Sequence, residues 1–261
     1  MPTRTSPESA PSEVTTMSED GTGDGTDATD EEDEDAATLS AFRLADSFLP
    51  TGTHTVSYGL EQFVQAGRVE DADDLQALLS TFLERQLGPG ELVVLRAAHT
   101  AARAGDLEAV YAADRRLSAV TLPAEFRESS CHAGQRLCLL QRDLQAEPLL
   151  EDYGERVDAG EVPGNHAAVL GVVTALAGID EREACLLYCH EFVTGLLGAA
   201  QRLLSLGHTN AQRVLDGLGP ATTAAVEDSA GRGIEDLSPF GPLVDVLAAE
   251  HERADRRLFV S

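Results

Sequence analysis

The stretch Leu44–Glu61, L-A-D-S-F-L-P-T-G-T-H-T-V-S-Y-G-L-E, separates two helical patterns with a compact break. The first pattern stops at Pro50, because proline lacks the N–H group that a continuing helix donates. Gly52 can adopt backbone angles that other residues avoid, and a second pattern begins at Ser57, a favourable N-cap residue. The Thr, Ser, His and Tyr content indicates a functional loop, while a plain capped helix start is the alternative.

Apolar residues recur with helical spacing from Leu39 onward. In the segment 72–87 they form a single face that consists of Leu75, Leu78, Leu79, Phe82 and Leu83. Further helices are expected at 91–104, 107–120 with Asp106 as N-cap, 125–145, 165–177, 181–206, 210–218, 222–231 and 243–258, and a loop or short helix at 146–163. No two-residue alternation is sustained, so we predict an all-α fold: one helical-bundle domain of about ten helices over residues 41–261.

Residues 1–40 differ from the rest of the chain. They contain hardly any apolar side chain, and Asp30–Asp35 is an unbroken run of acids. Such a segment buries too little surface to offset its chain entropy. We therefore expect a disordered acidic tail.

The charge is extreme, with a formal net charge of −26, a pI near 4.4 and no lysine. An acidic excess of this kind is typical of proteins kept soluble in concentrated salt, which predicts a halophilic, archaeal source. It also argues against nucleic-acid binding, which depends on basic residues that neutralise phosphates.

The sequence shows no membrane segment or signal peptide. The longest apolar run, Ala184–Leu206, is interrupted by His190, Glu191, Gln201 and Arg202, so we interpret it as a buried helix. No apolar core follows Met1, and four cysteines do not make a disulfide framework in a chain of this length. We expect a cytoplasmic protein with reduced thiols.

Cysteine and histidine residues supply the main alternative function. Cys185, Cys189 and His190 share one helical stretch, and Cys131, His132 and Cys138 share another; thiolate and imidazole ligands would suit zinc or nickel. Both groups lie in apolar helical runs, where cysteine usually acts as a small hydrophobic residue. No phosphate-binding loop or catalytic triad is recognisable. An all-helical metal-binding protein or enzyme nevertheless stays open.

Four stretches, in order and spacing, resemble the urease accessory protein F family. They are Pro50–Gly52 with Ser57–Glu61, Glu125–Leu137, Asn165–Val172 and Gln201–Gln212. The resemblance runs from about Leu44 to the C-terminus. Five positions depart from the family pattern: Thr53 replaces a glycine, Val56 a histidine, Cys131-His132 a basic pair, and His208 a glutamine.

The resemblance implies an all-helical homodimer that is not an enzyme. Members of the family join a second accessory protein, the D or H component, and recruit the nickel-dependent GTPase UreG, so that nickel reaches apo-urease. The resemblance also implies that nickel is handled by the complex and is not held tightly by this chain.

The expected partner-binding residues come from these motifs and from the C-terminus. They are Ser57, Tyr58, Glu61, Glu125, Arg127, Ser130, Arg202, Gln212, Arg256, Arg257, Leu258 and Phe259. We expect Ser57–Glu61 and the helix beginning near Glu125 to form partner or dimer surface more than core. For Arg127 a buried or i, i+4 ion pair within the helical domain is the alternative. The segment 250–261 combines a local cluster of arginines with an apolar end, so it is expected to order on a partner or to dock on its own domain.

The charge predicts a stability that depends on salt. More than half of the net negative charge lies outside the tail, and its self-repulsion is screened only when the ionic strength is high. The melting temperature should therefore rise from dilute buffer to molar KCl. Equal melting temperatures in the two conditions would contradict the halophilic interpretation.

Overall fold

The computed structural model describes residues 26–46, 48–51, 58–241 and 246, with backbone only for 26–30. Over these residues eleven α-helices follow one another and no strand occurs. The helices are α1 (Thr26–Leu44), α2 (Leu60–Gln65), α3 (Ala72–Phe82), α4 (Glu91–Arg103), α5 (Leu107–Val120), α6 (Ala124–Leu144), α7 (Pro148–Asp158), α8 (His166–Leu176), α9 (Glu181–Leu203), α10 (His208–Gly217) and α11 (Gly219–Ala230). A π-helix, η2 (Leu83–Leu87), continues α3, and a 3₁₀-helix, η3 (Ile234–Asp236), follows α11. The predicted all-α class is confirmed.

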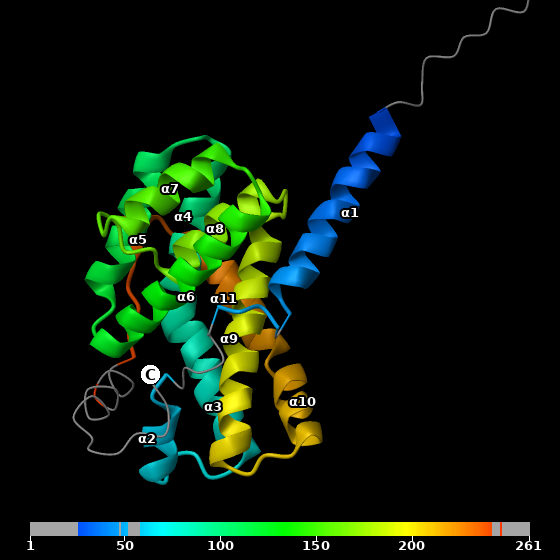
Figure 1. Cartoon of the computed structure of the whole chain (residues 1–261). Helices are drawn as coiled ribbons and strands as arrows, with labels where there is room; N and C mark the ends of the chain where they lie inside the picture. Colours follow the sequence, from blue (N-terminus) through cyan, green and yellow to red (C-terminus); the bar gives the residue numbers. More distant parts are fainter. Residues whose placement is uncertain (1–25, 47, 52–57, 242–245, 247–261) are drawn as a thin grey trace, which may run out of the picture.

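Helix α8 lies at the centre of the fold. Every residue from His166 to Ala175 is buried, because α4, α5, α6 and α9 pack around it (Figure 1). Its sequence has no charged residue and therefore no polar face to present to water. Of the helices that cover it, α4, α5 and α6 are amphipathic.

Two motif glycines allow these helices to approach α8 closely. A Cβ atom at Gly171 would lie 2.4 Å from the carbonyl oxygen of Leu95 on α4. A Cβ atom at Gly134 on α6 would lie 2.1 Å from the carbonyl oxygen of Gly164, just before α8. Both distances are far below van der Waals contact, so only glycine fits at these crossings.

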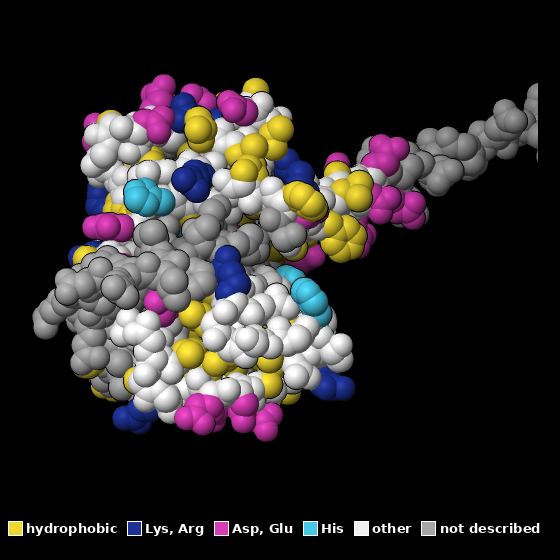
Figure 2. All heavy atoms as spheres, turned by 60° about the horizontal axis from the view of Figure 1, so that its bottom comes forward, with side chains coloured by type: hydrophobic (Ala, Val, Ile, Leu, Met, Phe, Trp, Pro, Cys, Tyr) yellow, Lys and Arg dark blue, Asp and Glu magenta, His cyan; other side chains and the backbone are white. Residues whose placement is uncertain are grey.

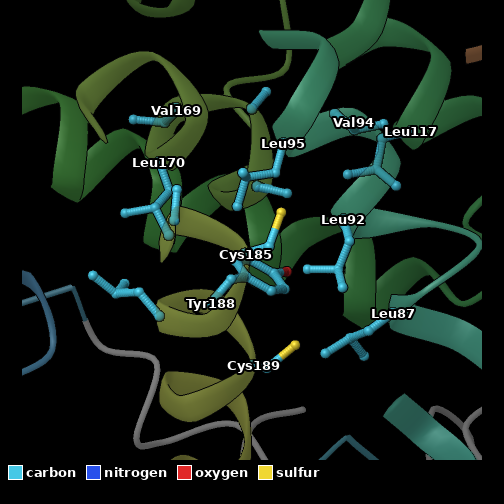
Figure 3. Packing of buried hydrophobic residues seen from close by; sticks show 14 of the residues in the cluster. Leu87, Leu92, Val94, Leu95, Leu117, Val169, Leu170, Cys185, Tyr188 and Cys189 are labelled. Atoms are coloured by element: carbon cyan, nitrogen blue, oxygen red, sulfur yellow. The ribbon is translucent and has the colours of Figure 1, made fainter. Parts of the chain in front are cut away.

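Three of the four thiols belong to the helical packing. Cys185 and Cys189 are fully buried, and Figure 3 shows them beside Tyr188 on the side of α9 that faces Leu92 and Leu95 of α4. Cys138 on α6 is also buried, and all four cysteines are free. These side chains fill core volume in the way that aliphatic side chains do.

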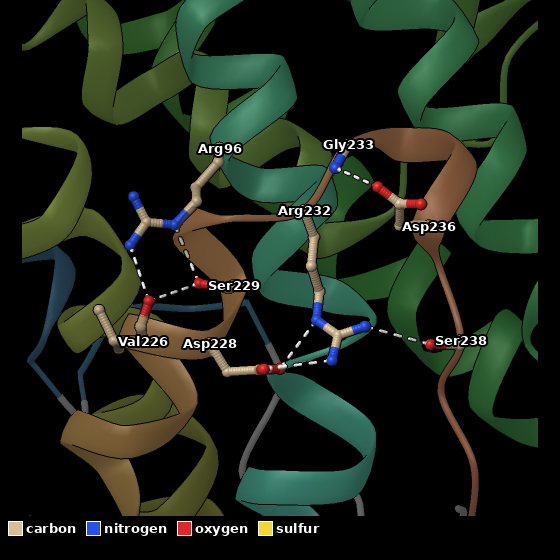
Figure 4. A network of polar contacts seen from close by, with 8 residues as sticks. All are labelled: Arg96, Val226, Asp228, Ser229, Arg232, Gly233, Asp236 and Ser238. Carbon is tan, nitrogen blue, oxygen red and sulfur yellow. Dashed lines mark hydrogen bonds and ion pairs between the residues drawn. The ribbon is translucent and has the colours of Figure 1, made fainter.

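Arginine side chains connect helices that are distant in sequence. Arg96 of α4 donates hydrogen bonds to the Ser229 hydroxyl (2.9 Å) and the Val226 carbonyl (3.0 Å) of α11 (Figure 4), and it pairs with Glu181 of α9 at 3.2 Å. Ser229 is fully buried. Buried polar groups need hydrogen-bond partners. The Arg96 side chain makes these bonds and so links the three helices α4, α9 and α11.

The N-terminal expectation needs correction. Residues 26–40 are helical, whereas the composition predicted a disordered tail up to residue 40. The helix forms without burial, since no described side chain before Ala41 is buried. Residues 1–25 lie outside the described residues. The first buried residue thus coincides with the predicted start of the packed domain.

Three other helix predictions differ in part from the structure. The second half of the opening stretch begins its helix at Leu60, because Tyr58 and Gly59 form a turn with φ angles of 43° and 74°. Residues 148–158 are a full helix, α7, where we expected a loop or a short helix. The helix predicted at 72–87 forms, but its last turn widens into η2. The helix predicted at 243–258 lies outside the described residues, apart from one helical position at 246.

Among the described helices, none is both long enough and apolar enough to cross a bilayer.

The close approach at Gly171 yields a direct test. Gly171→Ala should lower the free energy of unfolding by about 1–3 kcal/mol, because the added methyl group forces α4 and α8 apart. Gly198→Ala in α9 is the matched control, since its Cβ would meet no atom within 4 Å. The control should be neutral or stabilising by about 0.5–1 kcal/mol, because alanine is the better helix former. Urea denaturation measures both, and equal effects would show that the crossing at Gly171 is not tight.

Candidate functional site

Three of the motif stretches meet on one side of α9. The ring of Tyr58 lies 5.1 Å from that of Phe126 on α6 and 4.8 Å from that of Phe192 on α9, measured between centroids. Phe192 in turn contacts Phe82 of α3 at 5.8 Å. The Tyr58 ring therefore packs against other aromatic rings at the edge of the core. Its backbone has a left-handed conformation, which non-glycine residues rarely adopt.

A buried polar pair lies beside the Tyr58 ring. His166, the first residue of α8, places its Nε2 2.9 Å from Glu191 Oε2 of α9. The backbone N–H of His166 donates to the Ser130 hydroxyl of α6 at 3.2 Å, and its ring lies 5.7 Å from that of Tyr188. The start of α8 is therefore bound to both α6 and α9.

A small cavity adjoins this pair. It is lined by Tyr58, His166, Tyr188, Glu191, Phe192, Gly195 and Leu196 and has a volume of about 20 Å³. This volume holds roughly one water molecule. His166 Nδ1 is buried and has no hydrogen-bond partner among the residues that the structure describes, so a water in the cavity would satisfy it.

Asp114 of α5 positions the residues before α8. Its carboxylate accepts hydrogen bonds from the Tyr153 hydroxyl (2.9 Å), the Gly164 N–H (2.8 Å) and the N–H and side-chain amide of Asn165 (2.9 and 2.7 Å). Burial raises the pKa of Asp114, while these donors act in the opposite direction. Asn165 is thus fixed, and with it the position of His166 in the site.

Glutamates give the site a negative field. Burial raises the pKa of Glu91, at the start of α4, to about 7, and the buried Glu91 Oε2 has no hydrogen-bond partner in the described part of the chain. The pKa of Tyr58 is raised by burial first and then by Glu91 and Glu191. Burial is thus the main reason that the Tyr58 hydroxyl keeps its proton, and two acids from different helices act in the same direction.

A groove with a volume of about 670 Å³ opens next to the buried pair. One wall is the turn between α1 and the opening motif, and the other is the outer side of α9. The lining residues are Ala45, Asp46, Leu49, Thr51, His190, Glu191, Thr194, Gly198, Gln201 and Arg202. Glu191 therefore belongs both to the buried site and to the surface groove.

The described residues contain no group of three or more His, Cys, Asp and Glu side chains arranged to hold a metal ion. Burial raises the pKa of Cys185 to about 12 and that of Cys138 to about 11, so both thiols are protonated at neutral pH. A protonated thiol is a poor metal ligand and a poor nucleophile. The described part of the site can present shape and charge to a partner, with its polar groups held in place by packing.

Comparison with known proteins identifies the family. The UreF family model matches residues 69–219, more than half of the chain. The chain belongs to the UreF family. It is 32% identical to the urease accessory protein UreF of Trichodesmium erythraeum over 223 residues, 85% of this chain and 96% of that protein. UreF 1 of Brucella melitensis is 32% identical (85% and 92% covered), and UreF of an Arthrobacter species is 30% identical (85% and 96% covered).

The expected partner-binding residues of this UreF protein differ in how exposed they are. Glu61 is 1% exposed and accepts a hydrogen bond from Gln65, so the expectation that it lies on the surface is wrong. Arg127 donates to the Thr121 and Leu122 carbonyls at 2.7 Å and so caps the C-terminus of α5, a structural contact that differs from the ion pair given as its alternative. Its role in partner binding stays a prediction. Tyr58 and Ser130 belong to the buried junction, and Glu125 is half-buried.

The remaining candidates lie at the far end of α9 or outside the described residues. Arg202 and Gln212 are exposed, on α9 and α10 respectively. Ser57, Arg256, Arg257, Leu258 and Phe259 lie outside the described residues.

Sequence reasoning missed two buried acids, Asp114 and Glu191, and the partly buried Glu91. A signal was present for Asp114, because it shares a helical face with Val110, Tyr111 and Leu117. Glu191 likewise interrupts an apolar run. An acid on the apolar face of a helix indicates a buried polar network, although its partners cannot be named from the spacing.

Glu91 predicts a pH-dependent stability. In the folded protein Glu91 keeps its proton up to about pH 7, whereas in the unfolded chain it loses the proton near its ordinary pKa of 4.5. Its stabilising contribution is therefore complete below pH 4.5 and is lost as the pH rises to about 7. Glu91→Gln should remove this loss and raise the free energy of unfolding around pH 8 by on the order of 1–3 kcal/mol.

The matched control is Glu84→Gln on η2, an exposed glutamate. Its profile of unfolding free energy against pH should follow that of the unchanged protein. If Glu91→Gln gave the same profile as the control, Glu91 would be ionised normally in the folded state.

Proposed function

We propose that this UreF protein acts in urease maturation as a non-enzymatic scaffold. It would join a D-type or H-type accessory protein, bind the UreG-type GTPase as a homodimer, and bring that assembly to apo-urease. Membership of a urease accessory family supports the general role. The partners and the dimer are our proposal.

The observation that supports the proposal is the position of the motif residues in the structure. Tyr58, Ser130, Gly134, Asn165 and His166 fit together to hold one turn and one helix start against α9. Their side chains brace a shaped junction, and the groove of about 670 Å³ beside it is open to a partner. Preorganised surface of this kind suits docking, because little ordering entropy is lost on binding.

Nickel in this proposal is cargo of the assembly. The buried cysteines, with pKa values raised by burial, do not favour a tight site on this chain. The exposed end of α9 and the start of α10, with Arg202 and Gln212, supply charge and hydrogen-bonding groups for a partner surface.

The double variant Arg202→Ala, Gln212→Ala tests the docking role. Both side chains are exposed, so the melting temperature should change little, whereas urease activation should fall several-fold on loss of partner contacts. The variant is expressed with the urease subunits and the other accessory proteins in a host without urease. Urease activity and the nickel content of purified urease are then measured.

Arg103→Ala, an exposed arginine at the end of α4, serves as the control and should leave activation unchanged. Full activation by the double variant would show that this end of α9 is not part of the partner surface. Full activation of urease in the complete absence of the chain would overturn the proposed function.

A further inference from the structure

Helix α1 projects from the body of the protein and is attached along one side only (Figure 1). Ala37 is partly buried against the core, Ala41 and Leu44 are buried, and Arg43 donates to Gln141 of α6 at 3.3 Å. The positions 37, 41 and 44 share one helical face. The attachment therefore uses the last two turns of a helix of 19 residues.

The opposite face of α1 carries exposed apolar side chains. Leu39 is 67% exposed and Phe42 is 69% exposed, and their i, i+3 spacing makes them neighbours. At 100° per residue they point away from the attached face. Such a pair, on a helix without other cover, is the usual form of anchor in recognition of a helix by a groove.

Acidic side chains continue the same outer face toward the N-terminus. Glu31, Glu32 and Asp35 are exposed and lie on the same side of the helix as Leu39 and Phe42, with Asp35 between the two apolar positions in projection and the two glutamates on either side. Figure 2 shows acidic and hydrophobic side chains next to each other on the projecting helix. The outer face thus has an apolar end near the body and an acidic end beyond it.

The charges on the outer face of α1 indicate what kind of partner would bind to it. Pairing of two α1 helices would bring the acidic ends of two outer faces together, so local repulsion disfavours another α1 as the occupant. Complementarity requires an apolar groove with Arg or Lys at one end.

We propose that α1 is a docking helix, and that Leu39 and Phe42 anchor it in an apolar groove of a partner protein whose basic residues face Glu31, Glu32 and Asp35. The identity of the probes below rests on the proposed function. The docking helix itself is argued from the described residues alone.

The test compares binding of the full chain to three purified probes: the D-type accessory protein, the GTPase and apo-urease. The anchor variant is Leu39→Ser, Phe42→Ser, and the charge variant is Glu31→Gln, Glu32→Gln, Asp35→Asn. The control is Leu139→Ser, Leu144→Ser, which removes two exposed apolar side chains from α6. All substituted side chains are exposed, so circular dichroism should show an unchanged fold.

For one probe the anchor variant should weaken binding at least about tenfold, the charge variant should reduce the dependence of Kd on salt, and the control should match the unchanged chain. Unchanged affinity of both variants for all three probes would overturn the docking helix while leaving the proposed function standing. If the chain itself bound none of the probes, both proposals would fail. A shift of the anchor variant from dimer to monomer would show that the occupant is a second copy and would also overturn the proposal.

Discussion

The buried carboxylate of Asp114 is the interaction on which the site depends. It has no basic partner among the described residues and is stabilised by donors from Tyr153, Gly164 and Asn165. Loss of any one of these neutral donors is costly, because it leaves carboxylate charge without a hydrogen bond in a medium of low dielectric constant. Three helices, α5, α7 and α8, are therefore held in one arrangement by a single side chain.

This arrangement determines where the uncharged helix α8 begins and hence where His166 stands. Gly134 and Gly171 then let α6 and α4 come close to α8, so that these helices pack tightly on the central helix. The consequence appears at α9, where His166 meets Glu191 and Tyr58 fits between Phe126 and Phe192. The site is in this sense a product of core packing more than of surface chemistry.

Much of the fold could be predicted from the sequence, because apolar periodicity and Gly or Pro breaks carried local information. The helices α3 to α6 begin and end near their predicted limits, and Asp106 accepts from Ala109 N–H as an N-cap should. The helix α7 was ambiguous because its many acids concealed the spacing of Leu150, Tyr153 and Val157. The helix α1 contradicted its composition, since its described acidic part is helical without burial.

The site was less predictable, because its contacts join residues far apart in the chain. Asp114 and Asn165 are separated by 51 positions, and no local pattern reports that they meet. Motif matching found Tyr58, Ser130 and Glu61 but could not distinguish a buried bracing residue from an exposed docking residue. That distinction depends on which face of each helix is covered, and only the assembled packing shows it.

The placement of the four thiols gives the molecule a built-in reporter of its own opening. Cys138, Cys185 and Cys189 lie between α4, α6, α8 and α9, whereas Cys131 is half-exposed. An alkylating reagent reaches the buried three only when helices separate, so their labelling rates measure the free energy of opening at separate points of the core. Labelling of Cys131 instead tracks motion at the surface of α6, which makes local and global opening distinguishable within one unmodified chain.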